Sequence, residues 1–360
     1  MSQPIFVILA EGKLGLETSK TAASVVRYLP ERVTALIDSG HAGRTAQEVL
    51  GVGGGIPVVG SLAEALAITE RAPDALLVGI ANRGGTLPTE LRAVLVAAVD
   101  AGLDVWSGLH DRLMADARLV ALAEARRVRL VDLRDPPTGL PVGTGRALNT
   151  TAFRVLTVGT DCNVGKMTAS LEIRRVLQAG GVEARFAGTG QSGIVIDGAG
   201  IPVDAVVSDF VSGATERITL EAAKDADVVL IEGQGSLFHP GYSGVTLGLL
   251  HGSLPHAMIL CWMPGRKRVY GGGYDWLDLP TPERAITAYE EAMRWAAPQL
   301  GSRVIGLSAN TYDLPEVEAR LLVEEAGRAT GLPSTDPVRF GAEVLAEAVE
   351  VARRAGAGGD

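Results

Sequence analysis

The sequence predicts an α/β protein with two domains, and three observations support this prediction. The chain has 360 residues, and a single hydrophobic core rarely grows beyond roughly 250–300 residues. Hydrophobic residues make up 47% of the chain and aromatic residues only 4%, which is typical of aliphatic strands buried on both faces of a parallel sheet. Short apolar runs also alternate with helical patterns, which favours parallel strands joined by crossover helices.

The N-terminal part is expected to form a Rossmann-like parallel-sheet domain over residues 1–145. Its strands are expected where short apolar and β-branched runs occur, at 5–10, 33–37, 75–80, 104–106 and 128–132. Its helices are expected where apolar residues recur every three or four positions, at 21–29, 45–50, 62–69, 87–101 and 115–126. The segment 134–145 is rich in Pro and Gly and is the best candidate for a linker.

The most informative stretch is the turn between the next strand, 153–158, and the helix that follows it. This turn reads Gly159, Thr160, Asp161, Cys162, Asn163, Val164, Gly165, Lys166, Met167 and Thr168. A strand, a Gly-rich turn with a Lys and a helix, in that order, predict a phosphate-binding loop. Backbone N–H groups and the helix dipole point at one spot there, and Lys166 adds a full charge. We therefore expect these ten residues to bind a nucleotide-like cofactor.

The turn departs from the common form of the motif in two ways. Five residues separate Gly159 from Gly165, and Met167 rather than a hydroxyl residue follows Lys166. The order of strand, glycines, Lys and helix nevertheless favours a phosphate-loop NTPase-like α/β domain over residues 146–360. Its other strands are expected at 184–187, 205–207, 228–232, 257–262 and 304–307, and its helices at 169–177, 218–226, 282–296, 314–330 and 342–354.

Carboxylates near such a loop are candidates for holding Mg²⁺, which takes one or two carboxylates together with waters and phosphate oxygens. Glu232 follows a buried-strand run, at the sheet edge where ligands bind in open α/β sheets. Asp209 follows the expected strand 205–207, and Asp204 competes with it for the same role. The expected metal ligands are therefore Thr168, through its hydroxyl, with Asp209 and Glu232.

The expected catalytic residues are Lys166, Glu232 and His239. His239 lies in a Gly-rich loop and is the one plausible general base there by its ordinary pKa, although a loop His beside a Pro is more often structural. Asn310 follows a strand and either hydrogen-bonds an adenine edge or belongs to the cap of the next helix. Cys162 is interpreted as a small residue packed under the loop rather than a nucleophile.

Charge and composition exclude several classes of function. The net charge is −9 and the densest basic cluster, 266–268, is too short to bind nucleic acid. Two cysteines are too few for a disulfide framework or a Cys-based metal site. No apolar run reaches membrane-spanning length, so we expect a cytoplasmic protein without a membrane partner. The N-terminal domain either contacts a small ligand or supports a dimer, and we expect a homo-oligomer.

Two resemblances add to this interpretation. The pattern of Gly159, Thr160, Asp161, Val164, Gly165 and Lys166, with Glu232 later, resembles the dethiobiotin synthetase branch of phosphate-loop proteins. A closer resemblance covers nearly the whole chain, to a bacterial family of two-domain proteins of formerly unknown function that includes D-glutamate N-acetyltransferases. The stretches that carry it are 84–88, 107–110, 159–168, 190–193, 204–211, 231–240 and 242–252.

The two resemblances imply different reactions. The family resemblance implies an N-acetyltransferase that acts on a small amino acid of the D-glutamate type, with the nucleotide moiety of acetyl-CoA in the phosphate loop. The alternative is a kinase or ligase that uses ATP and Mg²⁺ to activate a small carboxylate substrate, which a Lys with two candidate carboxylates favours. A nucleotide-binding regulatory protein without turnover is the third hypothesis. The run 261–274 departs from the family pattern, which leaves the acceptor open.

Overall fold

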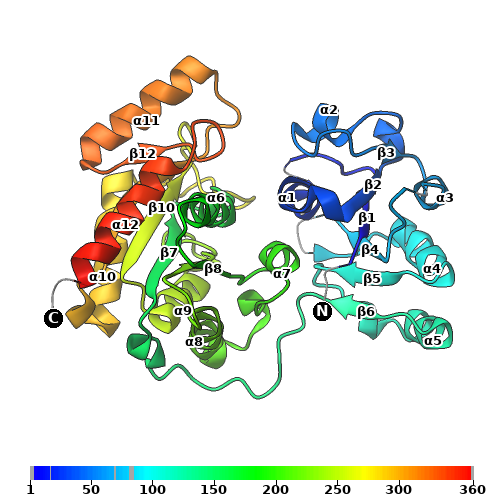
Figure 1. Cartoon of the computed structure of the whole chain (residues 1–360), viewed down its shortest axis with the longest axis horizontal. Coiled ribbons are helices and arrows are strands. Elements are labelled where there is room, and N and C mark those ends of the chain that lie inside the picture. The colour runs from blue at the N-terminus through cyan, green and yellow to red at the C-terminus, as the bar shows by residue number, and fades with distance from the viewer. Residues whose placement is uncertain (1–3, 17, 69, 81–84, 358–360) are drawn as a thin grey trace. The chain divides into compact units, whose positions relative to one another are not determined.

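The computed structural model describes residues 4–357 except 17, 69 and 81–84. The chain divides into two compact units, Met1–Asp135 with Ile194–Pro202, and Pro136–Gly193 with Val203–Asp360. Each unit is built on one six-stranded sheet (Figure 1). The predicted boundary after residue 145 lies between the last strand of the first sheet and the first strand of the second. Within the described residues, no helix combines the length and the apolar character that crossing a membrane requires.

The first sheet has the strand order β3-β2-β1-β4-β5-β6, and all its neighbouring strands are parallel. This is the order of a doubly wound Rossmann sheet, which confirms the predicted fold class. The strands are β1 Phe6–Leu9, β2 Val33–Ile37, β3 Val58–Val59, β4 Ala75–Val78, β5 Asp104–Ser107 and β6 Leu130–Asp132. The helices are α1 Lys20–Tyr28, α2 Ala46–Leu50, α3 Leu62–Leu66, α4 Arg92–Asp100 and α5 Ala117–Arg126.

The second sheet has the order β12-β11-β10-β7-β9-β8 and is also parallel throughout. Its strands are β7 Phe153–Gly159, β8 Ala184–Ala187, β9 Val228–Ile231, β10 Ala257–Trp262, β11 Arg303–Ala309 and β12 Ser334–Thr335. After β7 the chain fills one side of this strand with β8 and β9 and then crosses to the other side with β10. The carboxyl end of β7 is therefore the topological switch point, where open α/β sheets bind ligands.

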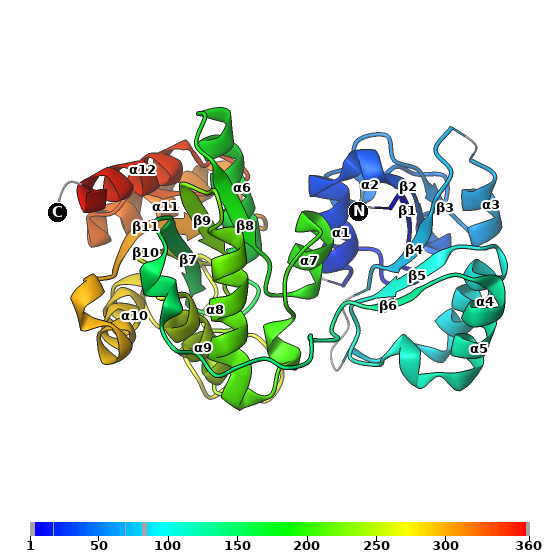
Figure 2. The same ribbon diagram turned by 60° about the horizontal axis from the view of Figure 1, so that its bottom comes forward.

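The helices in this half of the chain cover both faces of the second sheet. They are α6 Lys166–Ala179, α8 Val211–Ala222, α9 Ser243–Ser253, α10 Pro282–Ala296, α11 Glu316–Thr330 and α12 Glu343–Ala357. Helix α7, Gln191–Asp197, follows β8, and from Ile194 on it belongs to the first unit. Helices α8 and α9 lie side by side (Figure 2). Helix α9 was not predicted, because it contains glycines, which favour loops. A side chain on Gly252 would instead overlap the backbone of Ser212, so this glycine allows the two helices to approach closely.

The strand predicted at 205–207 is wrong. Ala205 ends one short 3₁₀ turn, Val203–Ala205, a second turn begins at Ser208, and Val207 between them is 66% exposed. A strand inside a parallel sheet is buried on both faces, so two adjacent valines are not enough to place one here. Asp209 consequently does not follow a strand.

A buried polar contact ties the start of β7 to the end of α9. Arg154 is fully buried, and its Nε donates to the carbonyl oxygens of Ser253 at 3.1 Å and Leu254 at 2.9 Å. A cation is favourable at this negative end of the helix dipole. The Nδ1 atom of His256 accepts the backbone N–H of Arg154 at 3.0 Å. Burial, with a smaller effect of Arg154, lowers the pKa of His256 to about 4.

We expect acid to destabilise the second unit through His256. Its folded pKa of about 4 lies below the unfolded value, so folding favours the neutral ring. This contribution is complete above about pH 6.5 and is lost as the pH falls toward about 4, by up to about 3 kcal/mol. Urea unfolding across this range should show a smaller loss for His256→Asn, whose amide oxygen can still accept the Arg154 N–H. Equal losses in both proteins would contradict this role.

Candidate functional site

The turn between β7 and α6 is the centre of the candidate site. Gly165, which precedes α6, has a φ of +96°, and Asn163 has a φ of +55°; both angles lie in the left-handed region that side chains disfavour. The α6 helix that follows is 14 residues long. Its first N–H groups have no partner within the helix and carry the positive end of its dipole. The loop therefore has the architecture of an anion-binding site.

Lys166 is the first residue of α6, and its side chain folds back onto the loop. The residue is 7% exposed, and its Nζ donates to the carbonyl oxygen of Asp161 at 2.7 Å. Burial is the main cause that lowers the pKa of this ammonium group. A buried cation held by one carbonyl oxygen is positioned to donate to an anionic ligand, because charge-assisted hydrogen bonds are the stronger ones.

Asp161 anchors a distant segment to the loop. It is fully buried, and its Oδ1 accepts the N–H of Cys162 at 2.7 Å, while Oδ2 accepts the N–H of Tyr270 at 2.6 Å. Arg266, from the segment after β10, lies 3.5 Å from Oδ2 and donates to the Cys162 carbonyl oxygen at 2.9 Å. These bonds hold the loop to the segment after β10, and a role of Asp161 in binding a cofactor stays a prediction.

Glu232 directly follows β9 and is 6% exposed. Its Oε2 accepts the N–H groups of Thr189 at 2.8 Å and Gly190 at 3.0 Å, in the loop after β8. Burial raises the pKa of Glu232 to about 7, although these two N–H groups and nearby Lys166 act in the opposite direction. The carboxyl group can therefore exchange a proton near neutral pH, as a general base must.

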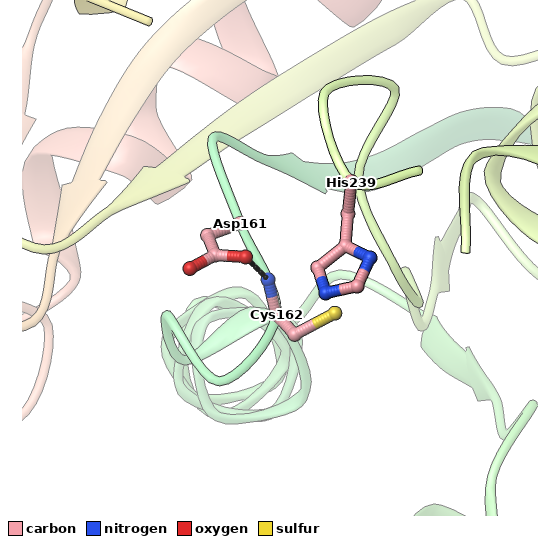
Figure 3. Close-up of side chains that lie close together, drawn as sticks. All are labelled: Asp161, Cys162 and His239. Atoms are coloured by element: carbon pink, nitrogen blue, oxygen red, sulfur yellow. Dashed lines mark hydrogen bonds between the residues drawn. The ribbon is translucent and has the colours of Figure 1, made fainter. Parts of the chain in front are cut away.

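His239 lies beside the Cys162 thiol (Figure 3), and one ligand atom from each of these residues and Asp161 lies within 4.8 Å of the others. His239 is 1% exposed. Its Nδ1 accepts the N–H of Gly241 at 3.1 Å, and its Nε2 lies 3.2 Å from the Tyr270 carbonyl oxygen. Because both ring nitrogens already hold backbone groups, this geometry favours a positioning role over proton transfer.

The fold places the other predicted site residues, Thr168, Asn310 and Asp209, in different surroundings. Thr168 lies in the first turn of α6 and is partly exposed. Asn310 follows β11 and lies beside the loop, since a Cβ added to Gly165 would be 3.8 Å from the Asn310 Cβ. Asp209 is exposed on a 3₁₀ turn. The structure thus gathers Lys166 and Asn310 at the loop but gives Asp209 no strand end to hold it there.

Two residues that shape the site, Arg266 and Tyr289, were not predicted from the sequence as site residues. Arg266 was noted only as part of a basic run, and Tyr289 lies on α10, where nothing in the helical pattern distinguishes it. The Tyr289 hydroxyl donates to the Gly159 carbonyl oxygen at 2.7 Å and accepts the N–H of Leu237 at 3.2 Å. It thereby joins the phosphate loop to the segment that follows Glu232.

Both units match known domain families. A family described as "Domain of unknown function (DUF1611_C) P-loop domain" matches residues 141–346. A second, described as "Domain of unknown function (DUF1611_N) Rossmann-like domain", matches residues 39–136. The crystal structure of a DUF1611 family protein from Anabaena variabilis is similar to this chain, with a TM-score of 0.89 and 36% identity. The likeness covers 96% of this chain and 99% of that one.

Two relatives carry the name of an enzyme. A D-glutamate N-acetyltransferase from Tritonibacter scottomollicae is 41% identical over 279 residues, which cover 76% of this chain and 80% of the relative. A D-glutamate N-acetyltransferase from a Pseudoalteromonas species is 36% identical over 269 residues, which cover 75% of this chain and 79% of the relative. The family inferred from the sequence is confirmed.

Proposed function

The chain belongs to the DUF1611 family, and from this premise we propose that it is an N-acetyltransferase. It transfers the acetyl group of acetyl-CoA to the amine of D-glutamate or a closely similar amino acid. The observation that carries this proposal is the 41% and 36% identity to two D-glutamate N-acetyltransferases.

The geometry of the loop region supports this reaction. The acceptor's ammonium group must lose a proton before its nitrogen attacks the thioester carbonyl carbon, and the C–S bond then breaks to release the thiol of coenzyme A. Glu232, with a pKa raised by burial to about 7, suits the proton acceptor. The helix N-terminus and Lys166 suit an anionic group of one of the two substrates.

An activity assay on the full chain separates this proposal from its alternative. Free thiol and the acetylated amino acid are measured with acetyl-CoA and D-glutamate, L-glutamate or D-aspartate, and ADP is measured with ATP, Mg²⁺ and the same acids. We expect thiol release that depends on D-glutamate and is unaffected by a chelator. ADP formation without thiol release would contradict the proposal and support a kinase or ligase, with Thr168 and Glu232 as metal ligands.

A further inference from the structure

Two cations meet at the phosphate loop. The Lys166 Nζ donates to the carbonyl oxygen of Asp161, and the Arg266 Nη1 donates to the carbonyl oxygen of the next residue, Cys162. The Arg266 side chain is 15% exposed. The charge of Asp161 is already shared among two N–H groups and Arg266. The loop with α6 therefore offers an excess of positive charge to a bound anion.

A carboxylate lies next to these cations. Glu232 is followed by Gly233, which packs against the Lys166 side chain, since a Cβ added to Gly233 would be 3.0 Å from the Lys166 Cδ. Among the residues that the structure describes, the N–H groups of Thr189 and Gly190 both bond the Oε2 atom of the Glu232 carboxylate. Two buried carboxylates therefore lie near the loop. Asp161 is already bonded by two N–H groups and Arg266, so Glu232 is the carboxylate left to serve a small molecule bound at the loop.

We propose that the phosphate loop binds a carboxylate of the amino-acid acceptor, with Lys166 and Arg266 as its cationic ligands and Glu232 beside the acceptor's amine. This inference rests on the proposed function and names the substrate that occupies the loop. Lys166, Arg266 and the positive end of α6 complement the carboxylates of D-glutamate, and Glu232 complements its ammonium group. An acidic amino acid therefore fits the site better than one with a neutral side chain.

The shape of the donor argues for the same assignment. The amine of D-glutamate is only a few bonds away from each of its carboxylates, so one molecule can contact the loop and Glu232 together. In acetyl-CoA the thioester is separated from the pyrophosphate by the whole pantetheine arm. If the donor's phosphates occupied the loop, its reacting carbon would lie far from Glu232, and a base acts only within hydrogen-bond reach.

Steady-state kinetics of Lys166→Met and Arg266→Met test this inference, because methionine keeps an unbranched apolar stem and removes the charge. We expect each variant to raise KM for D-glutamate by about 10-fold or more and to leave KM for acetyl-CoA within about twofold. Arg268→Met is the matched control, since Arg268 lies in the same segment and pairs with Asp278 at the surface.

D-glutamine provides a readout that a merely structural role would not change. The wild-type protein should prefer D-glutamate over D-glutamine, and Arg266→Met should lose most of this preference. A rise in KM for acetyl-CoA alone would place the donor's phosphates in the loop and overturn the inference, while the proposed function would stand. If the wild type acetylates neither acid, the proposed function fails. Calorimetric titration with D-glutamate then decides the inference: binding weakened by Arg266→Met supports it, and no binding or equal binding overturns it.

Discussion

Glu232→Gln is expected to lower kcat for acetyl transfer by on the order of 10²–10⁴-fold, the usual contribution of a positioned general base. Glutamine keeps the shape of the side chain, and its amide oxygen can still accept the N–H groups of Thr189 and Gly190. It cannot take a proton from the acceptor's amine. Thiol release with saturating acetyl-CoA and D-glutamate measures the effect. A variant with unchanged kcat would reduce Glu232 to a structural charge at a strand end.

The pH dependence of the wild-type rate should report the same carboxyl group. Because burial raises the pKa of Glu232 to about 7, the group is protonated and inactive below that pH. The rate should therefore rise with pH and level off above about pH 7, and the residual activity of Glu232→Gln should lack this limb. If the limb persists in the variant, another group titrates there.

The same substitution should stabilise the fold at high pH. A carboxyl group whose pKa is raised by folding contributes its full stabilisation below its unfolded pKa, and this contribution is lost as the pH rises through the folded pKa of about 7. Glu232→Gln should then raise Tm more at about pH 8 than at about pH 5. Glu216→Gln is a control with the opposite expected sign. Burial acts to raise the pKa of Glu216, but the hydrogen bonds from Arg146 and Thr144 are stronger, and the net effect is a lowered pKa. The Glu216→Gln variant should therefore lose stability at neutral pH.

The strands of both sheets could largely be predicted because parallel strands buried on both faces give uninterrupted apolar runs. β2 and β10 have the expected bounds, Val33–Ile37 and Ala257–Trp262. The missed strands, β3 and β12, are two residues each, which is too short for any pattern.

Homo-oligomer formation stays a prediction that light scattering can test.

The site could be predicted only where its geometry is local. The loop and Glu232 follow directly from a strand and the residues after it. Arg266 is 105 positions from Asp161, and Tyr289 is 130 positions from Gly159. The folded sheet brings these residues together, and no local pattern records that contact. The prediction of His239 as a general base shows a different limit. The residue type suggests this role, but it does not reveal that both ring nitrogens contact backbone groups.

Gly233→Ala is expected to damage the fold and the site together. The residue lies where β9 leads into the loop beside β7, and its N–H donates to the Thr157 Oγ1 at 3.0 Å. A Cβ at this position would overlap the backbone carbonyl oxygen of Thr157 and press on the Lys166 side chain. The strand cannot yield like a flexible side chain, so we expect a loss of about 3 kcal/mol or more in the free energy of unfolding.

Gly244→Ala is the matched control, because a Cβ there has nothing within 4 Å and alanine favours the helix α9. Urea unfolding and titration with D-glutamate should be done on both variants. Relief of the overlap requires Gly233 to move away from β7, and the adjacent Glu232 must then move relative to Thr189 and Lys166. Binding should therefore weaken in Gly233→Ala even at temperatures where it remains folded. Wild-type stability and binding in that variant would show that the close packing of β9 on the loop does not position the carboxylate.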